Sequence, residues 1–330
     1  MQFILGSSSP RRKELLESIG IIPDLIISPD IDESNLKDEL PTACAKRLAK
    51  NKAVKIKNDY PDSLILTADS IAFCGRRIID KTDNVEVARD YLKLLSQELY
   101  KYKISSFRYD KRGVAESLGN IKLANEIKFQ DFVKDVKEII KYFRHSNHYN
   151  SITLIGHSEG SLIGMIASQK SDVDKFVSIA GAGEDYLTVI QRQLSNQPPY
   201  IKSMSDPIIE QLRNKKLVDS IPPLLNNLFG LNIQEFLIDA GSYNPSIEIS
   251  KLNIPILIVQ GTNDIQIEIK DAQMLHDAAS KSTIEIIQGM NHVFRQASEN
   301  FILNLQTYGN PDLPIDKNLV NIIVEFINQN

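Results

Sequence analysis

Cysteines and long apolar runs are both scarce in this sequence. Its 330 residues include two cysteines, Cys44 and Cys74, which are far apart and show no Cys-x-x-Cys or Cys/His spacing. A disulfide framework or a cysteine-based metal site is therefore not expected, and we interpret both side chains as reduced, buried thiols. No stretch approaches the ~18 apolar residues of a membrane-spanning helix, and the N-terminal apolar run is too short for a signal peptide. We therefore expect a cytoplasmic protein with no membrane partner.

Positive charge is not in excess either. The 38 Lys and Arg residues are outnumbered by 42 Asp and Glu residues, which gives a formal net charge of −4. This balance does not support nucleic-acid binding and favours a small-molecule substrate. With 42% hydrophobic and 24% charged residues, the chain has the composition of a globular protein, long enough for two domains or one large α/β domain. The composition does not predict the oligomeric state.

Strand patterns alternate with helix patterns, which predicts an α/β fold with a mostly parallel sheet and flanking helices. From about residue 98 onward, the predicted strands are residues 104–109, 152–155, 176–180, 256–259 and 284–287. Residues from about 184 to 250 interrupt the alternation with prolines and helix-like stretches, so we interpret them as a helical lid. A continuous helix is expected over residues 91–101, across the junction between an N-terminal and a C-terminal region of different character.

The most informative motif is the run Gly156-His157-Ser158-Glu159-Gly160. It follows an apolar strand pattern and precedes a helix pattern, so it predicts a sharp turn with Ser158 at the apex. A glycine two positions before and two positions after the serine allows the backbone to turn tightly and to expose Oγ. Ser158 is therefore predicted to be the nucleophile of a serine hydrolase.

A nucleophilic serine needs a base, and the base needs a carboxylate that orients it. Asp264 follows the predicted strand at 256–259, and His292 follows the predicted strand at 284–287. The order Ser, Asp, His, each at the carboxyl end of a strand, is the one that α/β sheets use for this chemistry. We therefore predict His292 as the general base and Asp264 as the carboxylate that selects its tautomer.

On these motifs, residues 98–330 resemble the α/β-hydrolase family, and residues 108–117 are similar to the Tyr-Asp-x-Arg-Gly-x-Gly-x-Ser loop of many members. The resemblance is to the peptidase-like and esterase-like branch with a helical cap. It implies an α/β-hydrolase domain without a cofactor and an ester or peptide substrate. It also implies that the backbone N–H of Glu159 forms part of the oxyanion hole.

The same resemblance identifies a missing segment. The family has a second oxyanion donor in a Gly-rich loop after its third strand. In the sheet, this third strand lies between the fourth strand and the strand that leads into the serine turn, here called the elbow strand. Here no Gly-rich loop precedes the predicted helix at 91–101. We therefore expect a truncated hydrolase core, whose elbow strand either pairs with an N-terminal strand such as residues 64–67 or has no partner on that side.

The N-terminal region carries a second set of polar motifs. A serine and a proline after the first apolar strand pattern suit the start of a helix, whose free N–H groups make a phosphate site together with Arg11 and Arg12. Asp69 follows another apolar strand pattern, at residues 64–67. A carboxylate at such a position can hold a divalent metal or deprotonate a water molecule.

Residues 1–97 resemble the N-terminal half of the Maf family of nucleoside triphosphate pyrophosphatases, on Ser-Ser-Ser-Pro-Arg-Arg-Lys-Glu-Leu-Leu at 7–16 and Ala-Asp-Ser at 68–70. The resemblance implies that Asp69 is the general base that activates water on the α-phosphate. It implies a divalent cation, magnesium or manganese, as cofactor. The residues that it assigns to phosphate binding or to the lining of the site are Ser8, Arg11, Arg12, Glu33, Lys52 and Lys81. The second half of the family's motifs does not follow.

The chain is thus predicted to join two partial enzymes, a Maf-like region at 1–97 and an α/β-hydrolase domain at 98–330. The first hypothesis is a serine hydrolase that acts on an ester or peptide bond. The second is a pyrophosphatase that converts a nucleoside triphosphate to the monophosphate and diphosphate. The third is an inactive or decayed fusion. The substrate and any metal ligands are not identified by the sequence.

Overall fold

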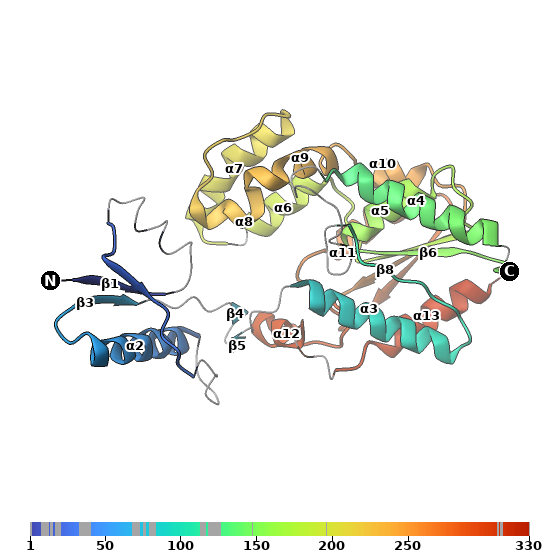
Figure 1. Cartoon of the computed structure of the whole chain (residues 1–330). Coiled ribbons are helices and arrows are strands. Elements are labelled where there is room, and N and C mark those ends of the chain that lie inside the picture. Colours follow the sequence, from blue (N-terminus) through green and yellow to red (C-terminus); the bar gives the residue numbers. More distant parts are fainter. Residues whose placement is uncertain are drawn as a thin grey trace. The chain divides into compact units, whose positions relative to one another are not determined.

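Two compact units make up the chain in the computed structural model. The first comprises Met1–Asn84 and Asn300–Asn310, and the second comprises Val85–Glu299 and Pro311–Asn330. Both contain parallel β-sheets (Figure 1). The structure describes residues 2–7, 13, 16, 21–32, 41–67, 73–74, 77–78, 84–112, 117, 127–146, 148–195, 197–308, 310 and 313–329.

The first unit is built on a small parallel sheet with the strand order β2-β1-β3. Its elements are β1 (Phe3–Gly6), β2 (Leu25–Ile27), α2 (Pro41–Asp59), β3 (Leu64–Thr67), the hairpin strands β4 (Phe73–Cys74) and β5 (Arg77–Ile78), and α12 (Phe301–Tyr308). Helix α2 can pack closely on the sheet because Gly6 has no side chain: a Cβ there would lie 2.5 Å from Ile56 Cδ1. The hydroxyl of Thr67 also donates a hydrogen bond to Ala49 O of α2 at 2.7 Å.

The second unit contains four parallel strands in the order β6-β7-β8-β9. They are β6 (Thr153–His157), β7 (Lys175–Ile179), β8 (Ile256–Gly261) and β9 (Ser282–Ile287). The flanking helices are α3 (Asn84–Lys101), α4 (Phe129–Ser146), α5 (Glu159–Ser168), α10 (Pro245–Ser250), α11 (Ile269–Ala278) and α13 (Lys317–Asn328). Figure 1 shows α4, α5 and α10 over one face of this sheet, and α3 and α13 over the other. The predicted parallel α/β sheet is confirmed, and α3 contains the predicted continuous helix over residues 91–101.

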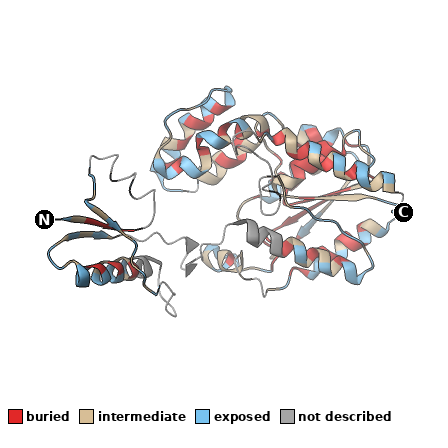
Figure 2. Ribbon diagram, in the orientation of Figure 1, coloured by how far each residue is buried: buried red, intermediate tan, exposed pale blue. Residues whose placement is uncertain are grey.

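Hydrophobic periodicity explains how the helices cover the sheet. The buried residues of α4 recur at intervals of one helical turn: Phe129, Phe132, Val133, Val136 and Ile140. Helix α5 is buried along most of its length, and Gly164 brings it so close to β7 that a Cβ would lie 2.6 Å from the Phe176 ring. The buried residues gather between these helices and the sheet (Figure 2). No helix in the described ranges is long and apolar enough to cross a membrane.

The segment predicted as a helical lid, residues 184–250, is mostly helical. Before α10 it contains α6 (Tyr186–Ser195), α7 (Pro199–Arg213), the 3-10 helix η3 (Pro223–Leu225), α8 (Asn226–Phe229) and α9 (Leu231–Ala240). These helices share an apolar cluster that includes Leu212, Phe229 and Leu237. Arg192 of α6 joins them to the rest of the unit, because its guanidinium lies 2.6 Å from the fully buried Asp271 of α11.

The predicted strand at residues 104–109 is wrong. Residues 104–111 belong to no helix or strand. Among the described residues, β6 pairs with β7 alone, whereas β3 (residues 64–67) pairs with β1 in the first unit. Strand β6 is accordingly only half-buried at most positions, while β8 is buried throughout. A segment with β-propensity forms a strand only where a neighbour satisfies its N–H and C=O groups, and no strand within the described ranges pairs with residues 104–109.

Candidate active site

Ser158 lies at the apex of the turn between β6 and α5. Its backbone is left-handed, with φ 54° and ψ −121°, and a strained conformation of this kind costs a non-glycine residue about 1–3 kcal/mol. The turn is held by a hydrogen bond from the Ser158 N–H to Ile179 O of β7 (3.0 Å) and by one from the Ser161 N–H to Ser158 O (2.9 Å). Such strain between a strand and a helix is typical of a nucleophile elbow, where it exposes the serine hydroxyl.

The two glycines of the motif are not equivalent. A Cβ on Gly156 would lie 2.3 Å from Gly160 O, so the close approach of β6 and α5 requires glycine at residue 156. A Cβ on Gly160 would have no atom within 4 Å. The sequence predicts that both glycines are needed for the turn, but the packing requires only the first.

Asp264 and His292 meet at the same end of the sheet as Ser158. Strands β8 and β9 are parallel neighbours, so the loops that follow them leave the sheet at the same edge. The Nδ1 of His292 donates a hydrogen bond to Asp264 Oδ2 at 2.8 Å, and the two side chains are 5% and 1% exposed. The other ring nitrogen, Nε2, is then the one that can accept a proton.

The Asp264 carboxylate is held in one orientation by several donors. Its Oδ1 accepts the backbone N–H groups of Gln266 (2.8 Å) and Ile267 (3.0 Å), and its Oδ2 also accepts the Gln260 side-chain amide at 3.1 Å. Burial raises the pKa of Asp264, but the charge of His292 and the hydrogen bonds from His292, Ile267 and Gln266 outweigh it, so the pKa is lowered overall. Asp264 is therefore ionised when the protein is folded at neutral pH.

His157 links the elbow strand to the His292 loop. Its Nε2 lies 2.9 Å from His292 O and its Nδ1 lies 3.1 Å from the Tyr91 hydroxyl, so Nε2 carries the proton and Nδ1 accepts from Tyr91. The rings of Tyr91 and Phe294 pack edge-on against it. The residue is partly exposed, yet both ring nitrogens contact protein groups. Burial, followed by the nearby charge of His292, lowers the pKa of His157 to about 3, so His157 is neutral.

Glu159 is the first residue of α5. Its N–H has no acceptor within the helix, and no hydrogen bond within the described ranges engages it, so it can donate to an oxygen above the elbow. Its carboxylate accepts from Lys111 Nζ at 2.5 Å and from the Tyr186 hydroxyl of α6 at 3.3 Å. The side chain of Glu159 thus joins the elbow to the segment before α4 and to the lid helices.

The Tyr109–Arg112 segment remains attached to the hydrolase core although it forms no strand. Arg112 contacts Asp135 of α4 through two nitrogens, one of them Nε at 2.9 Å from Oδ2. Tyr109 is 40% exposed, and the burial of the rest of its side chain, followed by the charges of Asp135 and Glu159, raises its pKa to about 12. This segment, which resembles a family loop, therefore lies against both α4 and the elbow.

The predicted site residues are only partly brought together. Asp264 and His292 are hydrogen-bonded, and His292 lies near the elbow, because its ring centroid is 4.7 Å from that of His157. No hydrogen bond joins the Ser158 hydroxyl to His292 in the described part of the chain. His292 therefore lies beside the residue that precedes Ser158, and the predicted contact between His292 and the Ser158 hydroxyl is not formed among the described residues.

Most of the predicted nucleotide-site residues lie outside the described residues. These are Ser8, Arg11, Arg12, Glu33, Asp69 and Lys81. Lys52 is described: it lies on α2 and is 7% exposed. Within the described ranges, no group of three His, Cys, Asp or Glu side chains could hold a metal ion.

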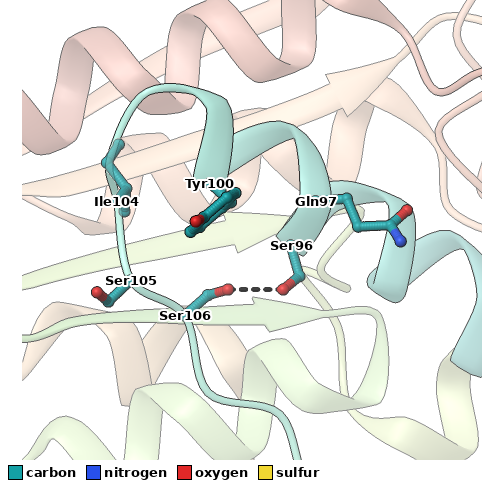
Figure 3. Close-up of a pocket in the computed structure, with 6 residues that line it drawn as sticks. All are labelled: Ser96, Gln97, Tyr100, Ile104, Ser105 and Ser106. Carbon is teal, nitrogen blue, oxygen red and sulfur yellow. Dashed lines mark hydrogen bonds between the residues drawn. The ribbon is translucent and has the colours of Figure 1, made fainter.

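A hollow of about 400 Å³ lies between α3 and the segment that follows it. It is lined by Ser96, Gln97, Tyr100, Ile104, Ser105 and Ser106, as Figure 3 shows. The hydroxyls of Ser96 and Ser106 are hydrogen-bonded at 2.7 Å across it. None of the predicted site residues lines this hollow.

Sequence reasoning missed three residues that contact the site: Tyr91, His157 and Gln260. Tyr91 is one of many residues on a helix, and nothing in its spacing indicates a role. His157 is part of the elbow motif, but its partners are far away in the sequence. Gln260 could have been found, because it is the one amide in the apolar run of β8, Ile-Leu-Ile-Val-Gln-Gly.

We expect Gly156→Ala to destabilise the second unit by about 1–3 kcal/mol, because the new methyl group must displace the backbone of α5. Gly160→Ala is the matched control and should be neutral or stabilising by up to about 1 kcal/mol, since alanine favours a helix and has room there. Urea denaturation followed by circular dichroism measures both changes. Equal destabilisation by the two substitutions would contradict this packing.

Acid should destabilise the fold in part through His157. In the unfolded chain this residue takes up a proton below about pH 6.5, whereas in the folded protein it does so only near pH 3. Stability is therefore lost as the pH falls from about 6.5 towards 3, by up to about 1.4 kcal/mol per pH unit.

The variant His157→Gln should flatten this dependence, because glutamine can keep both polar contacts without titrating. The control His148→Gln, at an exposed position, should leave the slope unchanged. Denaturation at a series of pH values gives the slopes. An unchanged slope in His157→Gln would show that His157 does not resist protonation.

Comparison with known proteins gives two family matches. Residues 85–295 match the family model described as serine aminopeptidase, S33. Residues 2–152 match the model described as Maf-like protein, so the two matches overlap over residues 85–152.

Curated relatives match the N-terminal part. A nucleoside triphosphate pyrophosphatase of Ehrlichia chaffeensis is 48% identical over 93 residues, which are 28% of this chain and 48% of that protein. A dTTP/UTP pyrophosphatase of Roseobacter denitrificans is 50% identical over 94 residues, which are 28% of this chain and 50% of that protein. The chain thus spans about half the length of these relatives.

Among solved structures, a lipase-esterase related protein from Clostridium acetobutylicum has 16% identity and a TM-score of 0.45, with 77% of this chain and 90% of that chain covered. Est1E from Butyrivibrio proteoclasticus bound to ferulic acid has 12% identity and a TM-score of 0.45, with 72% and 84% covered. The S33 family match extends over more than half of the chain and includes the elbow, the acid and the histidine. The chain therefore belongs to the serine aminopeptidase S33 family, and it is a hydrolase that also carries a Maf-like N-terminal region.

Proposed function

We propose that the protein hydrolyses an ester or peptide bond with Ser158 as nucleophile, His292 as general base and Asp264 as the orienting carboxylate. The observation that carries this proposal is the buried His292–Asp264 hydrogen bond at the same sheet edge as the left-handed Ser158. An ionised carboxylate on Nδ1 leaves Nε2 free to accept the serine proton. The short distance between the His157 and His292 rings supports a site in which the hydrogen bond between Ser158 Oγ and His292 Nε2 forms when substrate binds. Catalytic hydrogen bonds are often long in enzymes without substrate.

The reaction would take two steps. In the first, Ser158 Oγ attacks the carbonyl carbon while His292 Nε2 takes the serine proton and passes it to the leaving alcohol or amine. The products are an acyl-enzyme ester and the free leaving group. In the second, His292 deprotonates a water molecule, which attacks the ester and releases the acid and Ser158.

The oxyanion that forms in each step would be stabilised by the backbone N–H of Glu159. The second donor of the family belongs to the Gly-rich loop that this sequence lacks. Loss of one donor costs about 2.7–4 kcal/mol, or roughly 10²–10³ in rate. We therefore expect a slow enzyme.

The lid segment at about 184–250 would set the choice of acyl group or peptide. We propose that the functional division of the chain lies near residue 97, with the nucleotide-related motifs before it and the hydrolase after it. We also propose that the substrate is a small ester, peptide or nucleotide. The protein would have no nucleic-acid or membrane partner and would be cytoplasmic.

A fluorophosphonate probe tests the proposed nucleophile. We expect one label per chain, mapped to Ser158 by mass spectrometry, and none in Ser158→Ala. The matched control is Ser161→Ala, because Ser161 is a buried serine three residues further on that bonds Ser178, and this variant should still label. Asp264→Asn should slow labelling by up to ~10⁴-fold. If the folded wild-type protein is not labelled, the serine-hydrolase proposal is wrong.

A second candidate function is a nucleoside triphosphate pyrophosphatase centred on Asp69. The 48–50% identity to nucleotide pyrophosphatases favours it, although the chain spans only about half of those proteins. Asp69 would activate water, Ser8, Arg11 and Arg12 would hold the phosphates, and Glu33, Lys52 and Lys81 would line the site. A divalent cation, magnesium or manganese, would neutralise phosphate charge there.

Release of diphosphate from nucleoside triphosphates tests this candidate. If it is right, release requires magnesium or manganese, is abolished in Asp69→Asn and is unchanged in Ser158→Ala. Wild-type protein that releases no diphosphate would rule it out. Absence of both diphosphate release and Ser158 labelling would support an inactive fusion instead.

A further inference from the structure

Gln260 is a fully buried amide beside the proposed catalytic acid. It is the penultimate residue of β8, and its Nε2 contacts three oxygens: Ile267 O at 3.0 Å, Asp264 Oδ2 at 3.1 Å and Gly261 O at 3.3 Å. All three are acceptors, so the amide must direct its NH₂ group towards Asp264. The Oδ2 that accepts from His292 therefore also accepts from Gln260.

The other end of the Gln260 amide distinguishes it from a glutamine that only supports the fold. Its Oε1 is buried and has no donor within the described residues. Gln234, the other fully buried glutamine of the described part, satisfies both ends: Oε1 accepts from the Val218 N–H, and Nε2 donates to Val218 O and Phe229 O. A buried acceptor without a donor is unfavourable. The orientation of the Gln260 amide is therefore set by the hydrogen bonds that its Nε2 donates.

We propose that Gln260 is a positioning residue of the hydrolase site, which holds the Asp264 carboxylate in line with His292 and limits the negative charge that Oδ2 presents to the imidazole. This inference rests on the proposed function of Asp264 and His292. Two N–H groups share the charge of Oδ2, so removal of the Gln260 donor concentrates that charge on His292. The Nδ1 proton of His292 then faces a more concentrated negative charge, and the carboxylate that orients the imidazole has lost one of the groups that fix it.

Among the described residues, two titratable side chains contact His292. Asp264 contacts it from the loop after β8, and His157 contacts it from the end of β6. His157 is neutral at neutral pH, because burial lowers its pKa to about 3. Changes at residue 260 are therefore expected to reach His292 through Asp264.

The variants Gln260→Met and Gln260→Asn test the proposal. Methionine keeps the volume without the donor, and asparagine keeps an amide that is too short to reach Oδ2. In both, we expect the NMR resonance of the proton on His292 Nδ1, recorded at one fixed pH, to move from its wild-type position, because this proton is bonded to the oxygen that loses the Gln260 donor. For an ester substrate, kcat should fall by a larger factor than KM rises. The matched control Gln234→Met should lower stability without moving this resonance.

A folded Gln260 variant whose His292 Nδ1 proton resonance is unchanged, or moves no more than in Gln234→Met, would overturn the inference. A measurement on the wild-type protein covers the case in which the variants do not fold. The side-chain NH₂ group of Gln260 and the Nδ1 proton of His292 are bonded to the same oxygen and should show a nuclear Overhauser effect, and its absence when both resonances are observed would also overturn the inference. The NMR readout needs no turnover, so failure of this inference is distinguishable from an unlabelled Ser158, which would contradict the proposed function itself.

Discussion

Parallel pairing of β6, β7, β8 and β9 is the constraint on which the second unit depends. Because all four strands run in the same direction, the chain leaves each of them at the same edge of the sheet. Ser158, Asp264 and His292 therefore all follow strands at this edge, and Asp264 and His292 are hydrogen-bonded there although they are 28 residues apart in the sequence. The strained backbone of Ser158 is tolerated because hydrogen bonds to β7 and the close approach of β6 and α5 at Gly156 hold the turn from both sides.

The same sheet has an incomplete side. In the described structure β6 has no partner beyond β7, and the segment that follows α3 forms no strand. Side-chain contacts still attach this segment: Arg112 to Asp135 of α4, and Lys111 to Glu159 at the elbow. The unit thus contains the Asp264–His292 pair and the Glu159 N–H on which the proposed serine-hydrolase function depends. The structural cost falls on β6, whose outer edge has no partner strand among the described residues.

Asp264 and His157 are held in different charge states in the buried part of the site. Asp264 is kept ionised by His292 and by two backbone N–H groups, whereas His157 is kept neutral by burial and by the nearby charge of His292. In a low-dielectric site each of these states requires that its hydrogen-bond partners be fixed. This explains the importance of two uncharged residues: Tyr91 fixes the His157 ring, and Gln260 fixes the Asp264 carboxylate.

The sequence by itself determined the alternation of strands and helices, the elbow motif and the order of Ser158, Asp264 and His292, because periodicity and turn residues are local properties. It wrongly predicted a strand at 104–109, because local β-propensity does not reveal whether a partner strand exists. Only the tertiary structure decided that Gly156 is needed where Gly160 is not, and that Tyr91, His157 and Gln260 contact the site. Those outcomes depend on which atoms approach one another across the sheet, and spacing along the chain does not contain that information.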